Sequence, residues 1–389
     1  MSGRSRERRK HFNQLITTKY MPHTYIVVTT IRVPVFLRDI LENASAHGHQ
    51  KDTFSILVIG DVKTPPEAKE LCIQLASEFG RVIEYFTIAD QERELAEYPG
   101  LLELIPKNSG LRKKIGTFIA YQRGGENIIM VDDDNFPRPE TDFIGFHNIV
   151  GTEVEIDCIS SPTGWFNTYE TLEEKRGLKT FPRGYPWLQR TVNPPPHERK
   201  KQRVKVAINQ GAVFADTDVD TIARLFSPID IVAMKDEYKP GFGLTPGTWI
   251  SFNEQNTALA REWVPIFYTP IAARRNSDIW TAFMMCHIAQ HMGEVVTFGY
   301  PLVNQFRNPH DLFEDLGEEI GTYRATDRFV ELVRSVPLTE KTHLGVLDEL
   351  LHKCLSALPA LTGVTEVERG IIKDFFVEYQ AWSKIMPRK

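Results

Sequence analysis

The chain has 389 residues, of which 42% are hydrophobic and 25% are charged. These fractions describe an ordinary globular protein, long enough for a large core and for two domains or one domain with an extension. The formal net charge of −5 argues against a protein whose whole surface binds nucleic acid.

Cysteine usage and apolar runs indicate where the chain resides. Four cysteines are widely scattered and form no CxxC pair, which favours reduced thiols in a cytoplasmic protein over disulfides or a zinc knuckle. The basic start, MSGRSRERRK, lacks the apolar stretch of a secretory signal, and no window of about 18 apolar residues follows, so we expect no membrane span. We interpret residues 1–21 as a solvated tail; contact with a membrane surface or a polyanion is the alternative.

Short apolar strands alternate with helices in the first third of the chain. The expected strands are TYIVV at residues 24–28, FSILVIGD at 54–61, RVIEYFT at 81–87 and NIIMVDDD at 127–134. Helical patterns fill residues 35–43, 67–80 and 109–125 between them. The alternation predicts a mostly parallel α/β sheet, in which ligands bind beyond the carboxyl ends of the strands.

The remainder of the chain is less regular. Residues 160–203 are rich in aromatic residues, Pro and Arg, and we interpret them mainly as loops that could close over a ligand. A strand and a turn are expected from Val204, a strong helix at residues 276–294 and mostly helix at residues 327–386.

Three adjacent aspartates, Asp132, Asp133 and Asp134, stand at the end of the fourth strand. Their carboxylates repel one another unless a cation neutralises them. Mg²⁺ and Mn²⁺ are commonly held by one or two carboxylates together with substrate phosphates. We interpret the cluster as a metal–diphosphate site; the alternative is a structural role as a helix cap or as salt-bridge partners. Arg32 and Asp61 follow two other strands, so three strand ends indicate one crevice.

Basic side chains suited to a diphosphate occur in two places. Arg112, Lys113 and Lys114 begin the helix before the acidic strand, where a solvated helix face is the alternative interpretation. Arg183 lies in FPRGYPW, where Tyr185 and other aromatic residues indicate stacking on a flat ring or a sugar.

Asp278 stands at the start of the helix at residues 276–294. Such an acid either complements the helix dipole or faces the substrate as a general base or charge stabiliser. His287 and His291 have the spacing of a zinc-binding pair, but Ile288 occupies the place of the catalytic Glu, so we favour packing over metal binding. The acids at residues 216–220 precede a helix, and capping explains them.

Several motifs together carry a resemblance to a known family. They are IVVTTIRVPVFL (26–37), MVDDDNF (130–136), FNTYETLEEKRGLKTFPRGYPW (166–187), DTDVDTIARL (216–225), RRNSDIW (274–280) and FFVEYQAWSKIMP (375–387). In this order they resemble the reversibly glycosylated polypeptide, or UDP-arabinopyranose mutase, family of glycosyltransferase-like proteins. The resemblance implies a GT-A type fold, a Rossmann-like mixed α/β sheet flanked by helices, at residues 22–320, with a helical extension at residues 321–389.

The resemblance also implies roles for individual residues. Asp132 would approach the ribose and, with Asp134, the metal, while Asp133 would support or face the sugar. Thr30 and Arg32 would line the nucleotide pocket, and Asp61 would lie near the uracil. Arg183 would reach the diphosphate or the sugar, and Asp278 matches the second acid of an Asp-Asp-x-Trp pattern.

Three positions depart from the family's pattern. Ser277 replaces the first acid of the pair. Asn304 and Gln305 replace a histidine, for which His310 could substitute as a metal contact. The arginine that the mutases glycosylate would fall at Arg112–Lys114, where the surrounding cysteine and aromatic pattern is missing.

These features predict a metal-dependent glycosyltransferase that uses Mn²⁺ or Mg²⁺ and a nucleotide-sugar donor, UDP-linked in our interpretation. Asp278, Arg183 and Asp133 are the expected catalytic residues. Arg112, Lys113 and Tyr185 are expected to bind the nucleotide sugar together with the strand-end residues. The acceptor would be a small molecule or a polymer, and the helical extension could form a homo-oligomer. A UDP-sugar pyranose/furanose mutase and a non-catalytic nucleotide-sugar-binding subunit are the alternatives.

Overall fold

The computed structural model describes residues 23–193, 196–307 and 310–388, so the expected tail at residues 1–21 lies outside the described residues. The strands are β1 (Thr24–Thr30), β2 (Phe54–Gly60), β3 (Val82–Phe86), β4 (Asn127–Asp132), β5 (Asn135–Pro137), β6 (Glu153–Ser160), β7 (Leu172–Glu174), β8 (Glu198–Ala215), β9 (Ile231–Met234), β10 (Gly241–Leu244), β11 (Asn256–Ala260) and β12 (Glu294–Gln305). They form one mixed sheet of 12 strands in the order β3-β2-β1-β4-β11-β8-β6-β10-β12-β5, with β9 pairing β7 and β8 beside this path.

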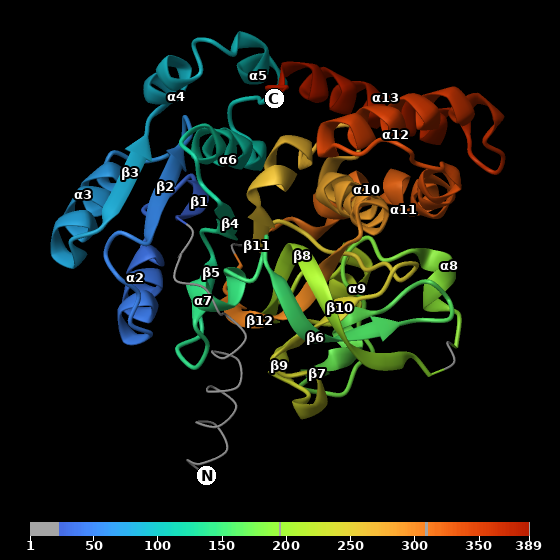
Figure 1. Cartoon of the computed structure of the whole chain (residues 1–389), viewed down its shortest axis with the longest axis horizontal. Coiled ribbons are helices and arrows are strands. Elements are labelled where there is room, and N and C mark those ends of the chain that lie inside the picture. The colour runs from blue at the N-terminus through green and yellow to red at the C-terminus, as the bar shows by residue number, and fades with distance from the viewer. Residues whose placement is uncertain (1–22, 194–195, 308–309, 389) are drawn as a thin grey trace.

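Helices flank the sheet (Figure 1). They are α2 (Leu37–Ala46), α3 (Glu67–Phe79), α4 (Ile88–Glu94), α5 (Pro99–Leu104), α6 (Lys113–Gln122), α7 (Phe143–His147), α8 (Trp187–Arg190), α9 (Thr221–Phe226), α10 (Ser277–Met292), α11 (Leu312–Ser335), α12 (His343–Ala357) and α13 (Glu366–Ile385). The expected fold class, a Rossmann-like mixed sheet flanked by helices with a helical carboxyl-terminal region, is confirmed.

The amino-terminal part of the sheet is parallel. β1 pairs with β2 and with β4, and β2 pairs with β3, all in the parallel sense. These four strands occur where the sequence predicted them. β1, β2 and β4 are buried almost throughout because their residues are apolar on both faces, as parallel strands covered by helices on both sides require.

Close packing of α6 against this sheet depends on Gly116. A Cβ atom at this position would lie 2.4 Å from Cγ1 of Val27 in β1 and 2.9 Å from Cγ1 of Ile59 in β2. Any larger residue would therefore push the helix away from the strands. The close approach brings Lys113, the first residue of α6, to the carboxyl end of β4.

The long strand β8 belongs to both parts of the sheet. Its first part pairs antiparallel with β6, its later residues pair antiparallel with β11, and β12 runs parallel along its other edge. The strand begins at Glu198, six residues before the expected start at Val204. The expected loop at residues 160–203 therefore includes the start of β8 as well as β7 and α8.

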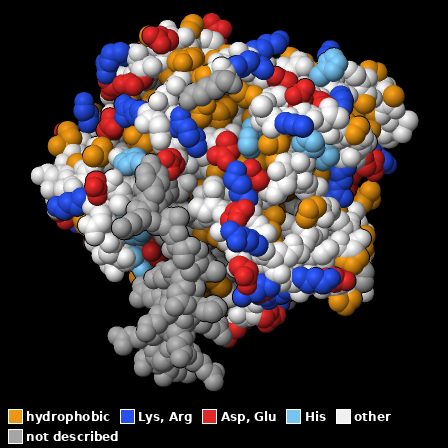
Figure 2. All heavy atoms as spheres, in the orientation of Figure 1, with side chains coloured by type: hydrophobic (Ala, Val, Ile, Leu, Met, Phe, Trp, Pro, Cys, Tyr) orange, Lys and Arg blue, Asp and Glu red, His pale blue; other side chains and the backbone are white. Residues whose placement is uncertain are grey.

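Ion pairs across the strands explain why so charged a segment forms a strand. They join Arg203 to Glu153, Lys201 to Glu155 and Arg199 to Asp157 on β6. Opposite charges on neighbouring strands stabilise their pairing. Figure 2 shows acidic and basic side chains side by side over this region rather than a patch of one sign.

Four helices, α10 to α13, gather at one end of the molecule (Figure 1). Helix α11 crosses the expected boundary at residue 320, and helix begins at Leu312, earlier than the expected residue 327. Trp280 of α10 joins the group, because its fully buried ring stacks on Phe329 of α11 at 4.2 Å and meets the edge of Phe375 of α13 at 5.4 Å. Within the described parts of the chain, none of the helices has the length and apolar character needed to cross a membrane.

Replacing Trp280 with alanine tests this helical junction. We expect the free energy of unfolding to fall by about 3–5 kcal/mol, because a large buried ring is lost and a cavity remains. Urea unfolding followed by circular dichroism measures the change. The matched control is Val367→Ala on α13, whose side chain is 74% exposed and which should change the free energy by less than about 0.5 kcal/mol. Equal effects of the two substitutions would contradict the role given to Trp280.

Candidate active site

The three aspartates lie at a topological switch point of the sheet. After β1 the chain continues to β2 and β3 on one side, and β4 then takes the other side of β1. The carboxyl ends of β1 and β4 therefore lie side by side at the edge where α/β sheets bind ligands. Asp132 is the last residue of β4, and Asp133 and Asp134 form the turn to β5.

Asp133 is held by the end of β1. The hydroxyl of Thr30 donates to Oδ2 of Asp133 at 2.6 Å, and the guanidinium of Arg32 donates to both carboxylate oxygens at 3.1 and 3.2 Å. The structure thus brings Thr30 and Arg32, expected in the nucleotide pocket, into contact with Asp133, expected to support or face the sugar. Arg32 remains 36% exposed in its side chain, so its outer edge is accessible to a ligand.

Asp132 is paired with Lys113, whose Nζ donates to Oδ1 of Asp132 and to the carbonyl oxygen of Glu254. Burial opposes the charge on the lysine, but Asp132 and Glu254 raise the pKa of Lys113. Lys114 is fully buried, 2.6 Å from the Glu254 carboxylate and with Nζ 4.2 Å above the ring of Phe267. The alternative of a solvated helix face is therefore wrong for both lysines.

Arg112 turns away from the acidic turn. Its guanidinium is buried and donates to Oε1 of Gln91, with Nε at 3.0 Å. The Gln91 amide in turn donates to the carbonyl oxygens of Gly60 and Phe86 at the ends of β2 and β3. These contacts give Arg112 a structural role. Through Gln91, it holds α4 against the ends of β2 and β3.

Asp61 follows β2 and is buried among backbone amides. Its Oδ1 accepts a hydrogen bond from the Val62 amide at 2.7 Å, and its Oδ2 accepts one from the Ser109 amide at 3.0 Å. The hydroxyl of Thr64 donates to the Thr30 carbonyl oxygen at 2.6 Å and ties this turn to the end of β1. Through Thr64, which also accepts from the Asp61 amide at 2.7 Å, Asp61 is held near the end of β1.

Asp134 has the least compensating charge of the three aspartates. Its carboxylate accepts hydrogen bonds from the neutral amide of Gln305 at 3.2 and 3.4 Å. Gln305 is in place because β5 pairs with β12, where the Phe306 amide donates to the Asp134 carbonyl oxygen at 3.0 Å. Burial and the neighbouring Asp132 raise the pKa of Asp134 to about 6.

Asp132 and Asp134 fit a divalent cation, because burial next to a like charge is relieved by a positive ion. Two carboxylates with a diphosphate completing the shell form a usual Mg²⁺ or Mn²⁺ site. Within residues 23–193, 196–307 and 310–388, no group of three or more His, Cys, Asp or Glu side chains is arranged to hold a metal ion. The expected third ligand, His310, instead lies 3.4 Å from Asp315 at the start of α11.

His287 and His291 bond to backbone carbonyl oxygens rather than to a common point. Their Nε2 atoms lie 2.9 Å from the oxygen of Val336 and 2.6 Å from that of Glu340. The favoured interpretation of packing histidines agrees with these contacts.

A second cluster of charges is built around Asp218. Arg183 donates through Nε to Asp218 at 3.0 Å and through Nη1 and Nη2 to Asp278 at 3.1 and 2.9 Å. Arg307 and Asn253 also donate to Asp218, at 3.2 and 2.7 Å. One buried carboxylate therefore receives two arginines, whereas Asp278 shares one of them.

Because the arginines are shared unequally, the pKa values of Asp218 and Asp278 differ. Burial acts to raise the pKa of Asp218, but Arg183 and Arg307 hold it well below its usual range. Burial raises the pKa of Asp278 to about 6 although Arg183 opposes the shift. Asp278, at the start of α10, is also the more accessible of the two, with 18% of its side chain exposed against 3% for Asp218.

The two clusters are continuous. Gln305, which donates to Asp134, accepts a hydrogen bond from Arg307 at 3.3 Å, and Arg307 reaches Asp218. The contacts therefore run from Asp134 to Asp278 across both parts of the sheet. Asp218, Gln305 and Arg307 were not among the expected site residues.

The sequence offered only a partial signal for Asp218. The acids at residues 216–220 were explained by capping, and Asp220 does cap α9, since its Oδ1 accepts from the Ala223 amide at 2.9 Å. Capping holds for Asp220, whereas Asp218 does not cap the helix and is paired with Arg183 and Arg307.

Tyr185 lines a pocket that is separate from the aspartate cluster. Its buried ring contacts Phe181 at 5.3 Å and Trp165 at 5.8 Å between ring centres. It lines a pocket with these residues, while Arg183, two residues earlier, points to Asp218 and Asp278. The structure therefore does not bring Tyr185 to the aspartate cluster.

The chain matches no known protein-family model and none of the curated proteins compared with it. Solved structures give weak similarities. The mannosyltransferase PcManGT from Pyrobaculum calidifontis, in complex with GDP-Man and Mn²⁺, has 10% identity and a TM-score of 0.36 over 98% of this chain and 94% of that one. S. aureus TarS 1-349 with UDP-GlcNAc has 9% identity and a TM-score of 0.39 over 93% and 92%. GalNAc-T7 with UDP, GalNAc and Mn²⁺ has 9% identity and a TM-score of 0.41 over 87% and 55%.

The Asp218→Ala substitution tests the buried charge cluster. We expect the free energy of unfolding to fall by about 3–5 kcal/mol, because two buried arginines lose their common partner. Chemical denaturation measures the effect. Asp230→Ala is the matched control, because its ion pair with Lys175 is exposed and should contribute at most about 1 kcal/mol. A change in Asp218→Ala no larger than in the control would show that the cluster does not stabilise the fold.

Proposed function

We propose that this protein is a metal-dependent glycosyltransferase of the GT-A type that uses a nucleotide sugar, UDP-linked, as its donor. The observation that carries the proposal is the position of Asp132–Asp134 at the switch point between β1 and β4, where Asp134 forms no ion pair with any residue that the structure describes. A site of this charge, at this place in a Rossmann-like sheet, suits a cation bound to a diphosphate. The bound cation would neutralise the charge that builds up on the leaving diphosphate.

The chain's own residues have separate tasks in this proposal. Asp132 and Asp134 would hold the cation, and Thr30, Arg32 and Asp61 would line the nucleoside side of the crevice. Arg32 fixes Asp133 in a bidentate pair, which keeps that carboxylate at a constant orientation toward the donor. Lys113 places a buried positive charge next to Asp132, close to where phosphate oxygens would lie.

Asp278 is the carboxylate that we propose to act on the acceptor, as a general base. A carboxylate with a pKa near 6 can accept a proton from an acceptor hydroxyl at neutral pH while remaining mostly charged. Arg183 orients this carboxylate and shares its positive charge with it. If no acceptor hydroxyl is present, the same negative charge would stabilise a positive charge that develops on the sugar ring.

The location of the protein is part of the proposal. Cys72, Cys158, Cys286 and Cys354 are all free thiols in the interior. Reduced cysteines are typical of the cytoplasm, and we propose that the protein works there.

Nucleotide-sugar binding is the first test. A panel of UDP- and GDP-sugars, each with and without Mn²⁺, should contain a ligand that raises the midpoint of thermal unfolding only when Mn²⁺ is present. At a hundredfold excess over its dissociation constant, such a ligand adds about 2.7 kcal/mol of apparent stability. Asp134→Asn should remove the Mn²⁺-dependent part of the shift, and the exposed-site control Asp230→Asn should keep it.

The outcomes of this panel separate the candidate activities. If no nucleotide sugar shifts the folded protein, the proposed function is wrong. A ligand that binds can then be incubated alone with the protein and Mn²⁺. A new UDP-sugar isomer formed without acceptor would identify a mutase, and consumption of the donor that requires an added acceptor would identify a transferase. Binding with neither reaction would identify a non-catalytic binding subunit.

The pH dependence of donor binding follows from Asp134. A metal ligand must be deprotonated, and the pKa of Asp134 is raised to about 6. We therefore expect the Mn²⁺-dependent affinity for the UDP-sugar to be constant above pH 7 and to fall about tenfold for each unit below pH 6. Isothermal titration calorimetry from pH 8 to pH 5 measures it. Asp134→Asn should bind weakly with no such fall, and an equal fall in that variant would assign the titration to another group.

A further inference from the structure

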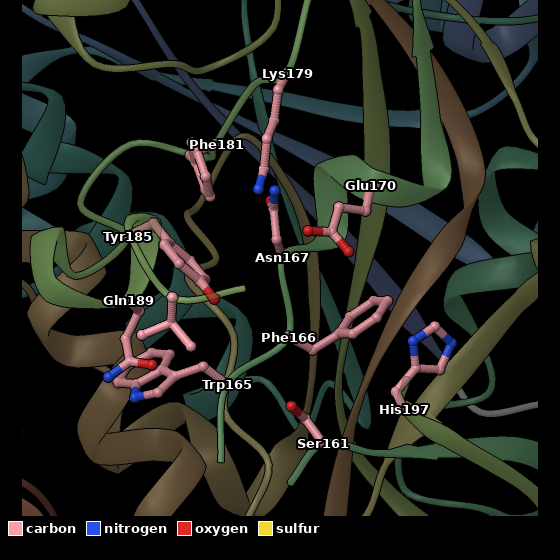
Figure 3. A pocket seen from close by; sticks show the side chains of 11 residues that line it. Ser161, Trp165, Phe166, Asn167, Glu170, Lys179, Phe181, Tyr185, Gln189 and His197 are labelled. Carbon is pink, nitrogen blue, oxygen red and sulfur yellow. The ribbon is translucent and has the colours of Figure 1, made fainter. Parts of the chain in front are cut away.

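A pocket on the other face of the FPRGYPW segment has no part in the site described above. It lies between the short helical turn at Thr168–Thr171, the segment of residues 179–185, helix α8 and the start of β8 (Figure 3). It encloses about 370 Å³ of free space, the solvent at its mouth included. None of Asp132, Asp133, Asp134 and Asp278 lines it.

Aromatic rings form a fixed wall of this pocket. Trp165, Phe166 and Tyr185 are buried, with Phe181 packed against Tyr185. Trp165 is held from behind by the guanidinium of Arg334, 4.8 Å from the ring centre. The phenol group of Tyr185 points into the pocket (Figure 3). The wall is therefore preformed; the half-buried ring of Phe181 provides an apolar surface, and the Tyr185 hydroxyl provides a polar edge.

Two polar side chains beside this wall, Glu170 and Gln189, are available for hydrogen bonds to a ligand. Glu170 directs its carboxylate into the pocket from the helical turn (Figure 3). Within the described parts of the chain, the side chains of Glu170 and Gln189 enter no hydrogen bond or ion pair. Asn167, by contrast, is fully used, since its amide donates to the Thr180 carbonyl oxygen and accepts from the Tyr169 amide. A carboxylate and an amide thus remain available to a ligand.

The charge of the pocket narrows the class of ligand. Glu170 carries a negative charge and Lys179 a positive one, with the Lys179 ammonium 5.2 Å from the ring centre of Phe181. Opposite single charges do not favour a strongly anionic ligand such as a free phosphate. Several hydrogen-bonding groups beside aromatic faces also do not suit a purely apolar ligand. A neutral ring with hydroxyl groups on its edge and C–H groups on its faces fits both features.

We propose that this pocket binds the hydroxyl-bearing edge of a neutral saccharide unit. The sugar would lie against Tyr185 and Phe181, with its hydroxyl groups donating to Glu170 and bonding to Gln189. The pocket is also connected to the charge cluster, because Arg183 lies between Phe181 and Tyr185 and its amide donates to the Asp218 carbonyl oxygen at 2.9 Å. The role of this saccharide as the acceptor rests on the proposed function. Its binding to the pocket is independent of that function.

Titration with methyl glycosides of glucose, galactose, mannose, N-acetylglucosamine and arabinose tests the proposal. Saturation-transfer NMR and tryptophan fluorescence should show at least one of them binding with a millimolar dissociation constant. Glu170→Ala should weaken that binding about tenfold or more and Gln189→Ala about fivefold, the losses expected for a charged and a neutral hydrogen bond. These side chains have no partner to lose within the described chain, so both variants should fold, which near-ultraviolet circular dichroism verifies.

Two controls separate this pocket from the rest of the molecule. Glu173→Ala, at an exposed position of β7, should bind the glycoside as the wild type does. Asp134→Asn should lose nucleotide-sugar binding and keep glycoside binding, so the two proposals fail separately. The pocket proposal is overturned if none of the five glycosides binds at about 50 mM, if binding survives in both pocket variants, or if Asp134→Asn abolishes it.

Discussion

Three neighbouring carboxylates can persist at the end of a buried strand only if their charges are balanced. The structure balances them unequally. Arg32 pairs with Asp133 and Lys113 with Asp132, but within the described residues Asp134 forms no ion pair. It accepts from the amide of Gln305, and Arg307 acts to lower its pKa from a longer distance. The partners come from three places in the chain: the segment that follows β1, helix α6 and strand β12. The packing of all three therefore fixes the electrostatics of one turn. The negative charge left on Asp134 is the feature on which the proposed cation site rests.

The same requirement of balance extends into the second part of the sheet. Arg307 bridges Gln305 to Asp218, and Arg183 bridges Asp218 to Asp278. Because buried charges are stable only with partners, the positions of these residues depend on one another. The cluster gives Asp218 a fixed charge and leaves Asp278 able to titrate. A pair of acids whose environments separate their pKa values is a frequent arrangement in active sites.

Much of the parallel sheet could be predicted from sequence, because β1, β2 and β4 are continuous apolar runs and strand ends have a known position relative to ligands. Thr30, Arg32 and Asp133 were therefore expected at the same edge of the sheet, where they contact one another, while their roles in binding stay predictions. The burial of Lys113 and Lys114 could not be predicted, since their partner Glu254 is far away in the sequence and a basic helix start resembles a solvated surface. Asp218 was hidden by Asp220, which satisfies the capping pattern. His310 was placed by proximity in sequence, whereas Asp315 on the next helix holds it.

The long strand β8 has a consequence for motion. It pairs with β6, β11 and β12 along its length, and β11 pairs in turn with β4, so β8 links the parallel strands to the rest of the sheet. A hinge that swung one part of the molecule against the other would have to break backbone hydrogen bonds in the middle of the sheet. Adjustment to a ligand must therefore come from side-chain rotation and from the segments above the strand ends. The scaffold favours a site that is preorganised before its ligand arrives.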